Sequence, residues 1–87
     1  MNKRWEDLAW IHYLEWQNED KKTLKRINAL LKDIERNGAA KGIGKPEALK
    51  YQYAGFWSRR IDEKNRLVYG IDENGYLYIV DCKGHYE

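Results

Sequence analysis

The spacing of the apolar residues changes near the middle of the chain, from a helical period to a period of two. One stripe recurs at intervals of three, four and three residues, the spacing of a single helix face: Leu24, Ile27, Leu31 and Ile34. From Leu49 onwards, apolar and polar residues alternate as they do along half-buried strands. This change predicts helices in the first half of the chain and strands in the second, which is an α+β organisation.

Two helices are expected in the first half, over residues 6–17 and 21–36. The apolar residues of the first recur at helical spacing and are expected to form its inner face: Leu8, Ile11 and the pair Tyr13–Leu14. Asp20 is a suitable N-cap for the second helix, and Asn37-Gly38 is a typical helix stop. Helices joined this tightly predict an antiparallel hairpin with a shared apolar face that needs a partner.

Three strands are expected in the second half: Phe56–Ile61, Arg66–Ile71 and Tyr76–Cys82. The turns between them are short, and the second one ends in Asn74-Gly75, a strong hairpin signal, so the strands must be antiparallel. A further short strand around Lys3 to Trp5 is expected to add at the edge. The predicted fold is therefore a two-helix hairpin on one face of a small, mainly antiparallel sheet of four to five strands, with the other face open.

Composition limits the class of protein. A chain of 87 residues is long enough for one domain, 1–87, and its four Trp and seven Tyr supply large buried areas. The single cysteine, Cys82, cannot form an internal disulfide, gives no zinc spacing, and is interpreted as a small apolar strand residue. No apolar run reaches the roughly 20 residues of a membrane span, and the first seven residues lack signal-peptide features. A cytoplasmic protein without membrane partners is expected.

Positive charge is concentrated in the middle of the chain. The net charge is +2, but residues 38–66 carry +4 and residues 67–87 carry −3. A polyanion could dock on the middle segment, although charge alone favours an ordinary solvated loop and hairpin. The Gly-rich segment 38–46 does not match a phosphate-binding loop and is interpreted as a connector whose basic residues can face a ligand.

Strand alternation predicts which side chains line the open face. The apolar residues place two sets on the core face: Trp57, Arg59 and Ile61 from one strand, and Leu67, Tyr69 and Ile71 from the next. Arg60 then lies on the open face beside Ser58, and Arg66 points the same way. Two converging arginines suit a phosphate, because the guanidinium fork matches its oxygens. Two surface charges paired with Asp62 or Glu63 explain the pattern equally well.

Other titratable residues are candidates for proton transfer. His85 and Tyr86 follow the last predicted strand after Gly84, which can let the tail bend back over the sheet. Histidine is the side chain best suited to exchange a proton near neutral pH. A lone terminal histidine is nonetheless usually incidental. Glu47 is a carboxylate at the start of the sheet region, where most such carboxylates are only solvated, and His12 on the first helix is given no functional role.

Four separated segments resemble one known family. They read Gly-Lys-Pro-Glu-x-Leu-Lys at 44–50, Gly-x-Trp-Ser-Arg-Arg-Ile at 55–61, x-Arg-Leu-Val-Tyr at 65–69 and Cys-x-x-His-Tyr at 82–86. The chain is similar in these segments, and along nearly its whole length, to the Txe/YoeB family within the RelE-like toxins of bacterial toxin–antitoxin pairs. The resemblance departs from the pattern at Lys83-Gly84, where some members carry Arg-Tyr, and at Glu87, since some members end at the tyrosine.

The resemblance implies a RelE-like fold and a toxin that cuts messenger RNA in the aminoacyl site of the ribosome. It implies attack by a ribose 2′-hydroxyl without metal or cofactor, inhibition by a cognate YefM/Axe-like antitoxin, and a homodimer. It assigns the residues that match the family motifs as follows: Glu47 the general base, Arg66 the transition-state arginine, His85 the general acid, Tyr86 the catalytic terminal tyrosine, and Lys50 and Arg60 the substrate-phosphate contacts.

Two other functions are compatible with the sequence. A degenerate toxin would dock on the ribosome or RNA without cutting, although Glu47, Arg66 and His85 are all present. A partner in an antitoxin complex would repress its own operon, which is compatible with a nuclease role.

Overall fold

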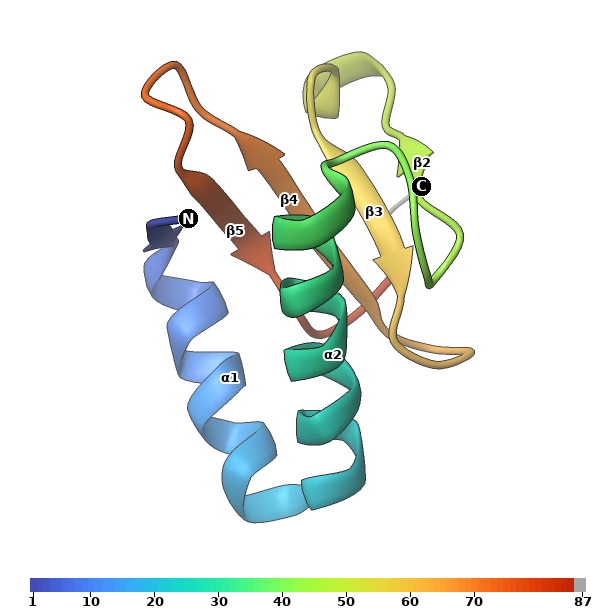
Figure 1. Ribbon diagram of the computed structural model, residues 1–87. Coiled ribbons are helices and arrows are strands. Elements are labelled where there is room, and N and C mark those ends of the chain that lie inside the picture. Colours follow the sequence, from blue (N-terminus) through green and yellow to red (C-terminus); the bar gives the residue numbers. More distant parts are fainter. Residues whose placement is uncertain (86–87) are drawn as a thin grey trace.

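The two predicted helices form an antiparallel hairpin that covers one face of the sheet (Figure 1). The computed structural model describes residues 1–85. Helix α1 spans Asp7–Glu19 and helix α2 spans Lys21–Asn37. The architecture is therefore the α+β arrangement that the change of apolar period predicts.

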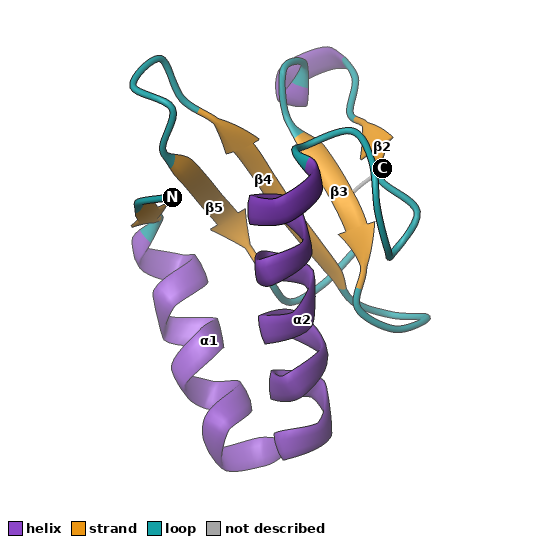
Figure 2. Cartoon of the chain, in the orientation of Figure 1, coloured by secondary structure: helices purple, strands orange, loops and turns teal. Residues whose placement is uncertain are grey.

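The sheet has five strands in the order β1-β5-β4-β3-β2. The strands are β1 (Lys3–Trp5), β2 (Glu47–Ala48), β3 (Trp57–Arg60), β4 (Arg66–Ile71) and β5 (Leu77–Asp81), with a 3₁₀ helix η1 (Tyr51–Tyr53) between β2 and β3. The expected N-terminal edge strand is present and pairs with β5 in parallel, whereas the other pairs are antiparallel (Figure 2). The mainly antiparallel sheet of four to five strands is thus confirmed.

Helix α2 follows its sequence signals closely. The Asp20 carboxylate accepts hydrogen bonds from the amides of Lys22 at 3.0 Å and Thr23 at 3.2 Å, as an N-cap does. Gly38 ends the helix at φ 86°, where a side chain would be strained. The inward face buries Ile27, Leu31 and Ile34 of the predicted stripe together with Leu30, whereas Leu24 is only partly buried. The apolar stripe therefore decides the orientation of the helix.

Helix α1 presents a different face from the one that the sequence predicts. Leu8, Ile11 and Leu14, expected inside, are 50, 51 and 42% exposed. The buried residues are instead Ala9 and Trp16, with Tyr13 packed at the edge of the core. Apolar residues surround this helix on several sides, so the spacing alone does not fix which side faces inward. The large Trp16 ring is buried on the inward side, where its Nε1–H donates to the Cys82 carbonyl at 2.9 Å.

Strand alternation in β3 and β4 is correct on the core face with one exception. Leu67, Tyr69 and Arg59 are fully buried beneath the helices, but Ile71, predicted to lie in the core, is 42% exposed. Ile71 is the last residue of β4 and lines a small surface hollow beside Tyr78. The helices therefore cover the start and middle of β4 more completely than its end.

Among residues 1–85, no helix combines the length and the apolar character that crossing a membrane requires.

Candidate functional site

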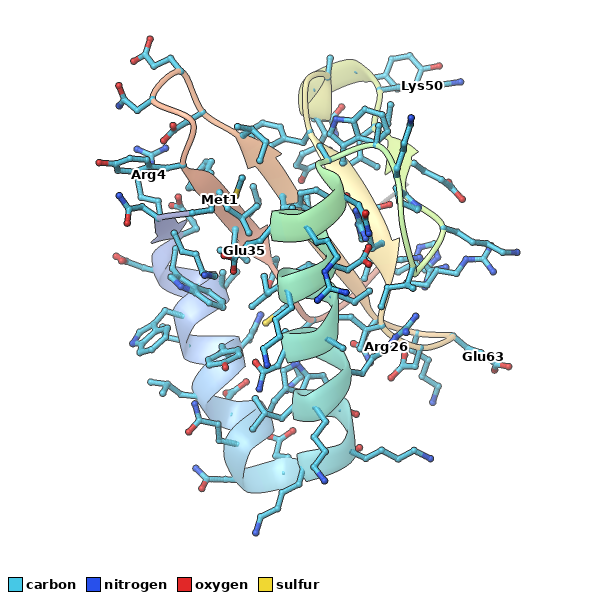
Figure 3. The ribbon with its side chains drawn as sticks, viewed as in Figure 1. Met1, Arg4, Arg26, Glu35, Lys50 and Glu63 are labelled. Carbon is cyan, nitrogen blue, oxygen red and sulfur yellow. The ribbon has the colours of Figure 1, made fainter. Side chains whose placement is uncertain are left out.

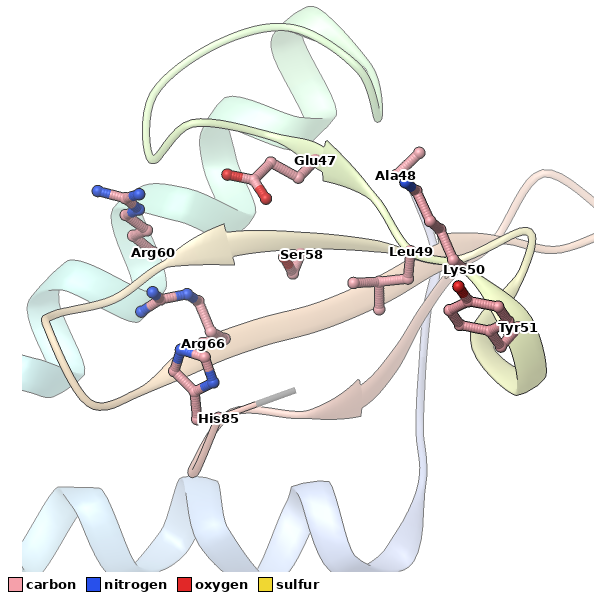
Figure 4. Close-up of a pocket in the computed structure, with 9 residues that line it drawn as sticks. All are labelled: Glu47, Ala48, Leu49, Lys50, Tyr51, Ser58, Arg60, Arg66 and His85. Atoms are coloured by element: carbon pink, nitrogen blue, oxygen red, sulfur yellow. The ribbon is translucent and has the colours of Figure 1, made fainter. Parts of the chain in front are cut away.

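A pocket of about 320 Å³ lies on the side of the sheet away from the buried core residues of β3 and β4 (Figure 4). Five of the six residues that the sequence nominated line it: Glu47, Lys50, Arg60, Arg66 and His85. Ala48, Leu49, Tyr51 and Ser58 complete the lining. The sixth residue, Tyr86, lies outside the described residues. Chain segments far apart in sequence therefore bring carboxylate, guanidinium, ammonium and imidazole groups to one hollow.

Glu47 is positioned by the short edge strand β2. It pairs with Ser58 of β3 in antiparallel register, and Ala48 pairs with Trp57. In Figure 4 the Glu47 carboxylate projects over Ser58, towards the end of the pocket where Arg60, Arg66 and His85 gather. Both residues of β2 are exposed, so the Glu47 carboxylate is open to solvent and to a ligand.

Arg60 and Arg66 face each other across neighbouring strands. They are direct partners in the β3–β4 register. Like charges in opposite positions destabilise a sheet, and a bound anion would offset that repulsion. The alternative was that these arginines pair with Asp62 or Glu63. Within residues 1–85, neither arginine forms an ion pair with either carboxylate within 4 Å. Arg66 instead donates from Nη1 to the Asp62 carbonyl oxygen at 2.8 Å.

The pKa of the Asp62 carboxyl is nevertheless affected by Arg66 and by the turn residues around it. Partial burial acts to raise the pKa of the Asp62 carboxyl, but hydrogen bonds from Asn65 and Lys64 and the positive charge of Arg66 outweigh it. The pKa of Asp62 therefore lies below its ordinary value, and the turn carries a stable negative charge next to the arginines.

The tail that carries His85 is tied to the start of β4. The Arg66 amide donates to the Gly84 carbonyl at 2.9 Å, and the Gly84 amide donates to Asn65 Oδ1 at 2.9 Å. Gly84 adopts φ 97°, which a residue with a side chain rarely takes, and the chain turns there. The prediction that the tail bends back towards the sheet is confirmed as far as His85.

A buried arginine fixes the Gly-rich connector beside the site. Arg59 is 0% exposed and donates to Asp33 Oδ2 at 2.5 Å and to the Tyr69 hydroxyl at 2.8 Å. Its remaining hydrogen bonds run to connector carbonyl oxygens, those of Gly38 at 2.9 Å, Lys41 at 2.6 Å and Ile43 at 3.0 Å. A buried guanidinium with every donor direction used makes this arrangement rigid.

The Arg59 hydrogen bond and burial shift the pKa values of the two titratable groups that Arg59 contacts. The Arg59 hydrogen bond lowers the pKa of the Asp33 carboxyl below its ordinary value, against the opposing effect of burial. Burial raises the pKa of the Tyr69 hydroxyl. Both groups therefore keep at neutral pH the charge states that the cluster needs.

The connector itself does not face the pocket. No residue of the segment 38–46 lines it, so the idea that its basic side chains face the ligand there is not supported. The connector instead leads directly into β2, and the Arg60 amide donates to the Gly44 carbonyl at 2.7 Å. Its role in the geometry of the site is to place Glu47.

Several residues of the site were missed by the sequence reasoning. Strand alternation places Arg59 on the core face but indicates no role for it, although a charged residue among core-facing apolar residues is typical of a buried ion pair. Asn65 occupies only the unspecified first position of the family segment 65–69, so the sequence does not indicate that it accepts the Gly84 amide. Leu49 lies in the family segment 44–50 but is given no role there, and Tyr51 lies outside all four family segments. Among residues 1–85, no three His, Cys, Asp or Glu side chains converge in a way that suits a metal ion.

Comparison with known proteins identifies the family to which the chain belongs. A family profile described as the YoeB-like toxin of bacterial type II toxin–antitoxin systems matches residues 5–86. The Toxin YoeB of Escherichia coli (strain K12) is 48% identical over 82 residues, covering 94% of this chain and 95% of that protein. A Toxin YoeB of Synechocystis sp. is 51% identical over 81 residues, covering 93% of this chain and 92% of that protein.

Solved structures show the same fold. Two from Staphylococcus aureus, a YoeB–YefM complex and a YoeB dimer, each superpose with a TM-score of 0.91 at 48% identity, covering 99% of this chain and 98% of theirs. The toxin–antitoxin complex RelBE2 from Mycobacterium tuberculosis superposes with a TM-score of 0.69 at 19% identity, covering 97% of this chain and 96% of that chain. The fold is therefore RelE-like, as the sequence resemblance implies.

Proposed function

Because the chain belongs to the YoeB toxin family of bacterial type II toxin–antitoxin systems, we propose that it is an endoribonuclease that cuts messenger RNA in the aminoacyl site of the ribosome. The single observation that carries this proposal is the shared pocket of Glu47, Arg66 and His85, which come from β2, β4 and the tail. A carboxylate, a guanidinium and an imidazole around one hollow are the groups that cleavage by a 2′-hydroxyl needs.

The proposed reaction uses side chains alone, without metal or cofactor. Glu47 takes the proton from a ribose 2′-hydroxyl, and that oxygen attacks the adjacent phosphorus. The bond from phosphorus to the 5′-oxygen breaks, and His85 gives this oxygen a proton. The products are a 2′,3′-cyclic phosphate and a free 5′-hydroxyl. Each proton transfer contributes typically 10²–10⁴-fold to the rate.

Positive charge in the pocket serves the phosphate. The facing pair Arg60 and Arg66 supports a role in which Arg66 stabilises charge developing on the phosphorane while Arg60 and Lys50 hold the substrate phosphates. Tyr86 is assigned a catalytic role by the family resemblance, in orienting the RNA next to His85. This mechanism requires the 2′-hydroxyl, so DNA is not a substrate.

The proposed partners are a YefM/Axe-like antitoxin that inhibits the toxin and a second copy of the chain. Relatives of high identity form a YoeB–YefM complex and a YoeB dimer. Helix α1 leaves Leu8, Ile11 and Leu14 exposed, and apolar residues this prominent on one helix are typical of an interface. Cytoplasmic ribosomes are the proposed place of action. An Ile11→Glu variant should weaken self-association in sedimentation experiments, whereas Lys21→Glu at the far end of the hairpin should not.

The test is cleavage of a message on purified ribosomes with an empty aminoacyl site. The protein should cut the aminoacyl-site codon and leave 2′,3′-cyclic phosphate ends, and a single 2′-deoxyribose at the scissile nucleotide should abolish the cut. Equal cutting of the 2′-deoxy message would contradict the mechanism. Equal cutting of the same RNA without ribosomes would contradict ribosome dependence.

Growth assays separate this proposal from a toxin that only blocks the ribosome. Glu47→Ala and His85→Gln should lose toxicity while the purified proteins keep the circular dichroism spectrum and melting temperature of the parent. Full toxicity in both variants would favour a blocker.

A further inference from the structure

Tyr51 lies at the opposite end of the pocket from Arg60 (Figure 4). Its side chain is 85% exposed, although an aromatic ring gains stability from burial. Lys50 lies beside it at the same end, and Leu49 and Ser58 lie between this end and the arginines. The pocket therefore has a charged end suited to phosphate and an end where an aromatic ring faces solvent. In the view of the whole molecule the Lys50 side chain projects outward from the chain (Figure 3).

The backbone of Tyr51 is also unusual. It adopts φ 57°, a left-handed conformation that costs free energy for a residue with a bulky side chain. Neighbouring hydrogen bonds hold the segment in this shape: the Tyr53 amide donates to the Lys50 carbonyl at 3.1 Å, and the Ala54 amide donates to the Tyr51 carbonyl at 3.0 Å. The Leu49 amide donates to the Phe56 carbonyl at 2.9 Å and ties the segment to β3. The ring is thus presented from a fixed loop.

We propose that the Tyr51 ring is a stacking platform for an unpaired base adjacent to the scissile phosphate. This inference rests on the proposed nuclease function. Unpaired RNA is recognised by stacking of its bases on aromatic side chains, with cationic side chains holding the backbone. Lys50 supplies the cation beside the ring, and the facing pair Arg60 and Arg66 holds the phosphate at the other end. Tyr51 thereby sets how the substrate is held without taking part in proton transfer.

Substitution by Asn gives the sharpest test, because Asn tolerates the left-handed conformation and has no ring. Tyr51→Asn should reduce kcat/KM on ribosome-bound message by tenfold or more, chiefly through KM, and should not lower the melting temperature. Tyr51→Phe keeps the ring and should cut within about twofold of the parent. If the hydroxyl group were the part of Tyr51 that matters, Tyr51→Phe would instead lose as much activity as Tyr51→Asn. Tyr76→Asn, at another exposed tyrosine outside the pocket, is the matched control and should leave cleavage unchanged.

A second readout reports stacking directly. The message carries 2-aminopurine in the aminoacyl-site codon and a 2′-deoxyribose at the scissile nucleotide, so that it binds without being cut. The parent and Tyr51→Phe should quench the fluorescence, and Tyr51→Asn should not.

The outcomes separate the two proposals. Equal cleavage and equal quenching by the parent and Tyr51→Asn would overturn the stacking role and leave the nuclease proposal intact. Quenching that depends on Tyr51, from a parent protein that does not cut, would contradict the nuclease and support stacking. A parent that neither cuts nor quenches would contradict both.

Discussion

The backbone amide of Arg66 donates a 2.9 Å hydrogen bond to the carbonyl oxygen of Gly84, the residue before His85. The side chain of Asn65, the neighbour of Arg66, accepts the Gly84 amide in return. Two adjacent residues at the start of β4 therefore hold the tail at one glycine. The position of the imidazole relative to the Arg66 guanidinium depends on these two bonds.

Removing the Asn65 side chain should disturb catalysis more than folding. Asn65→Ala loses the acceptor for the Gly84 amide and the contact with Asp62, so we expect roughly a tenfold lower kcat with a loss of about 1 kcal/mol in unfolding free energy. Single-turnover cleavage and urea denaturation measure the two effects. Asn74→Ala in the other hairpin turn is the control. Similar losses of kcat in both variants would show that the tie at Gly84 does not position the tail.

Arg59 should contribute far more to the stability of the fold than its neighbour Arg60. Arg59→Lys keeps the charge but cannot reach the separate acceptors that the guanidinium serves, so it leaves buried carbonyl groups unsatisfied. We expect the unfolding free energy to fall by about 3 kcal/mol. Arg60→Lys, one residue along on the exposed side, should change it by less than about 0.5 kcal/mol. Comparable effects in chemical denaturation would contradict the clamp.

The contribution of Asp33 to stability should depend on pH. Its pKa in the folded protein lies below the ordinary value because of the Arg59 hydrogen bond. A carboxyl with a lowered folded pKa stabilises the protein above its unfolded pKa of about 4 and loses that contribution as the pH falls through the folded value. The parent should exceed Asp33→Asn in unfolding free energy by its largest margin at pH 6, and this margin should shrink below about pH 4. A difference that stays constant down to pH 3 would exclude this linkage.

Cys82 should be inert in the folded protein. Its side chain is fully buried, and burial, with the charge of Asp81 adding to it, raises the pKa of the thiol to about 12. At pH 8 about one thiol in ten thousand is then ionised, so iodoacetamide should modify Cys82 only after unfolding in guanidinium chloride. Mass spectrometry measures the modification. Rapid labelling of the native protein would mean that the strand end opens readily.

The elements that the sequence predicts well are those with a strong local signal. The α2 stripe, the Asp20 cap and the Asn74-Gly75 turn are each short-range signals, and the structure contains the helix and the β4–β5 hairpin that they indicate. The inner face of α1 was predicted wrongly because its apolar residues lie on more than one side. A hydrogen bond from Trp16 to the Cys82 carbonyl helps to fix which side of α1 faces inward. The two residues are far apart in the sequence, so no local pattern predicts this bond.

The residues of the candidate site also fall into those that a local pattern predicts and those that it does not. Strand parity places Arg60 and Arg66 on one face, and the β3–β4 register makes them direct partners. Glu47 and His85 became candidates mainly through the family resemblance, because an edge strand of two residues and a bent tail leave little trace in periodicity. Arg59 and Tyr51 depend on long-range contacts and on an irregular backbone. Parity alone gave neither of them a role.

The order of the strands also constrains how the protein is made. Strand β5 follows every other element in chain order but lies between β1 and β4, so it contributes hydrogen bonds to both sides of the sheet. A nascent chain that has not yet released residues 77–81 from the ribosome cannot close the sheet or bring His85 to Glu47. The hollow shared by Glu47, Arg66 and His85 therefore forms only after β5 has taken its place in the sheet.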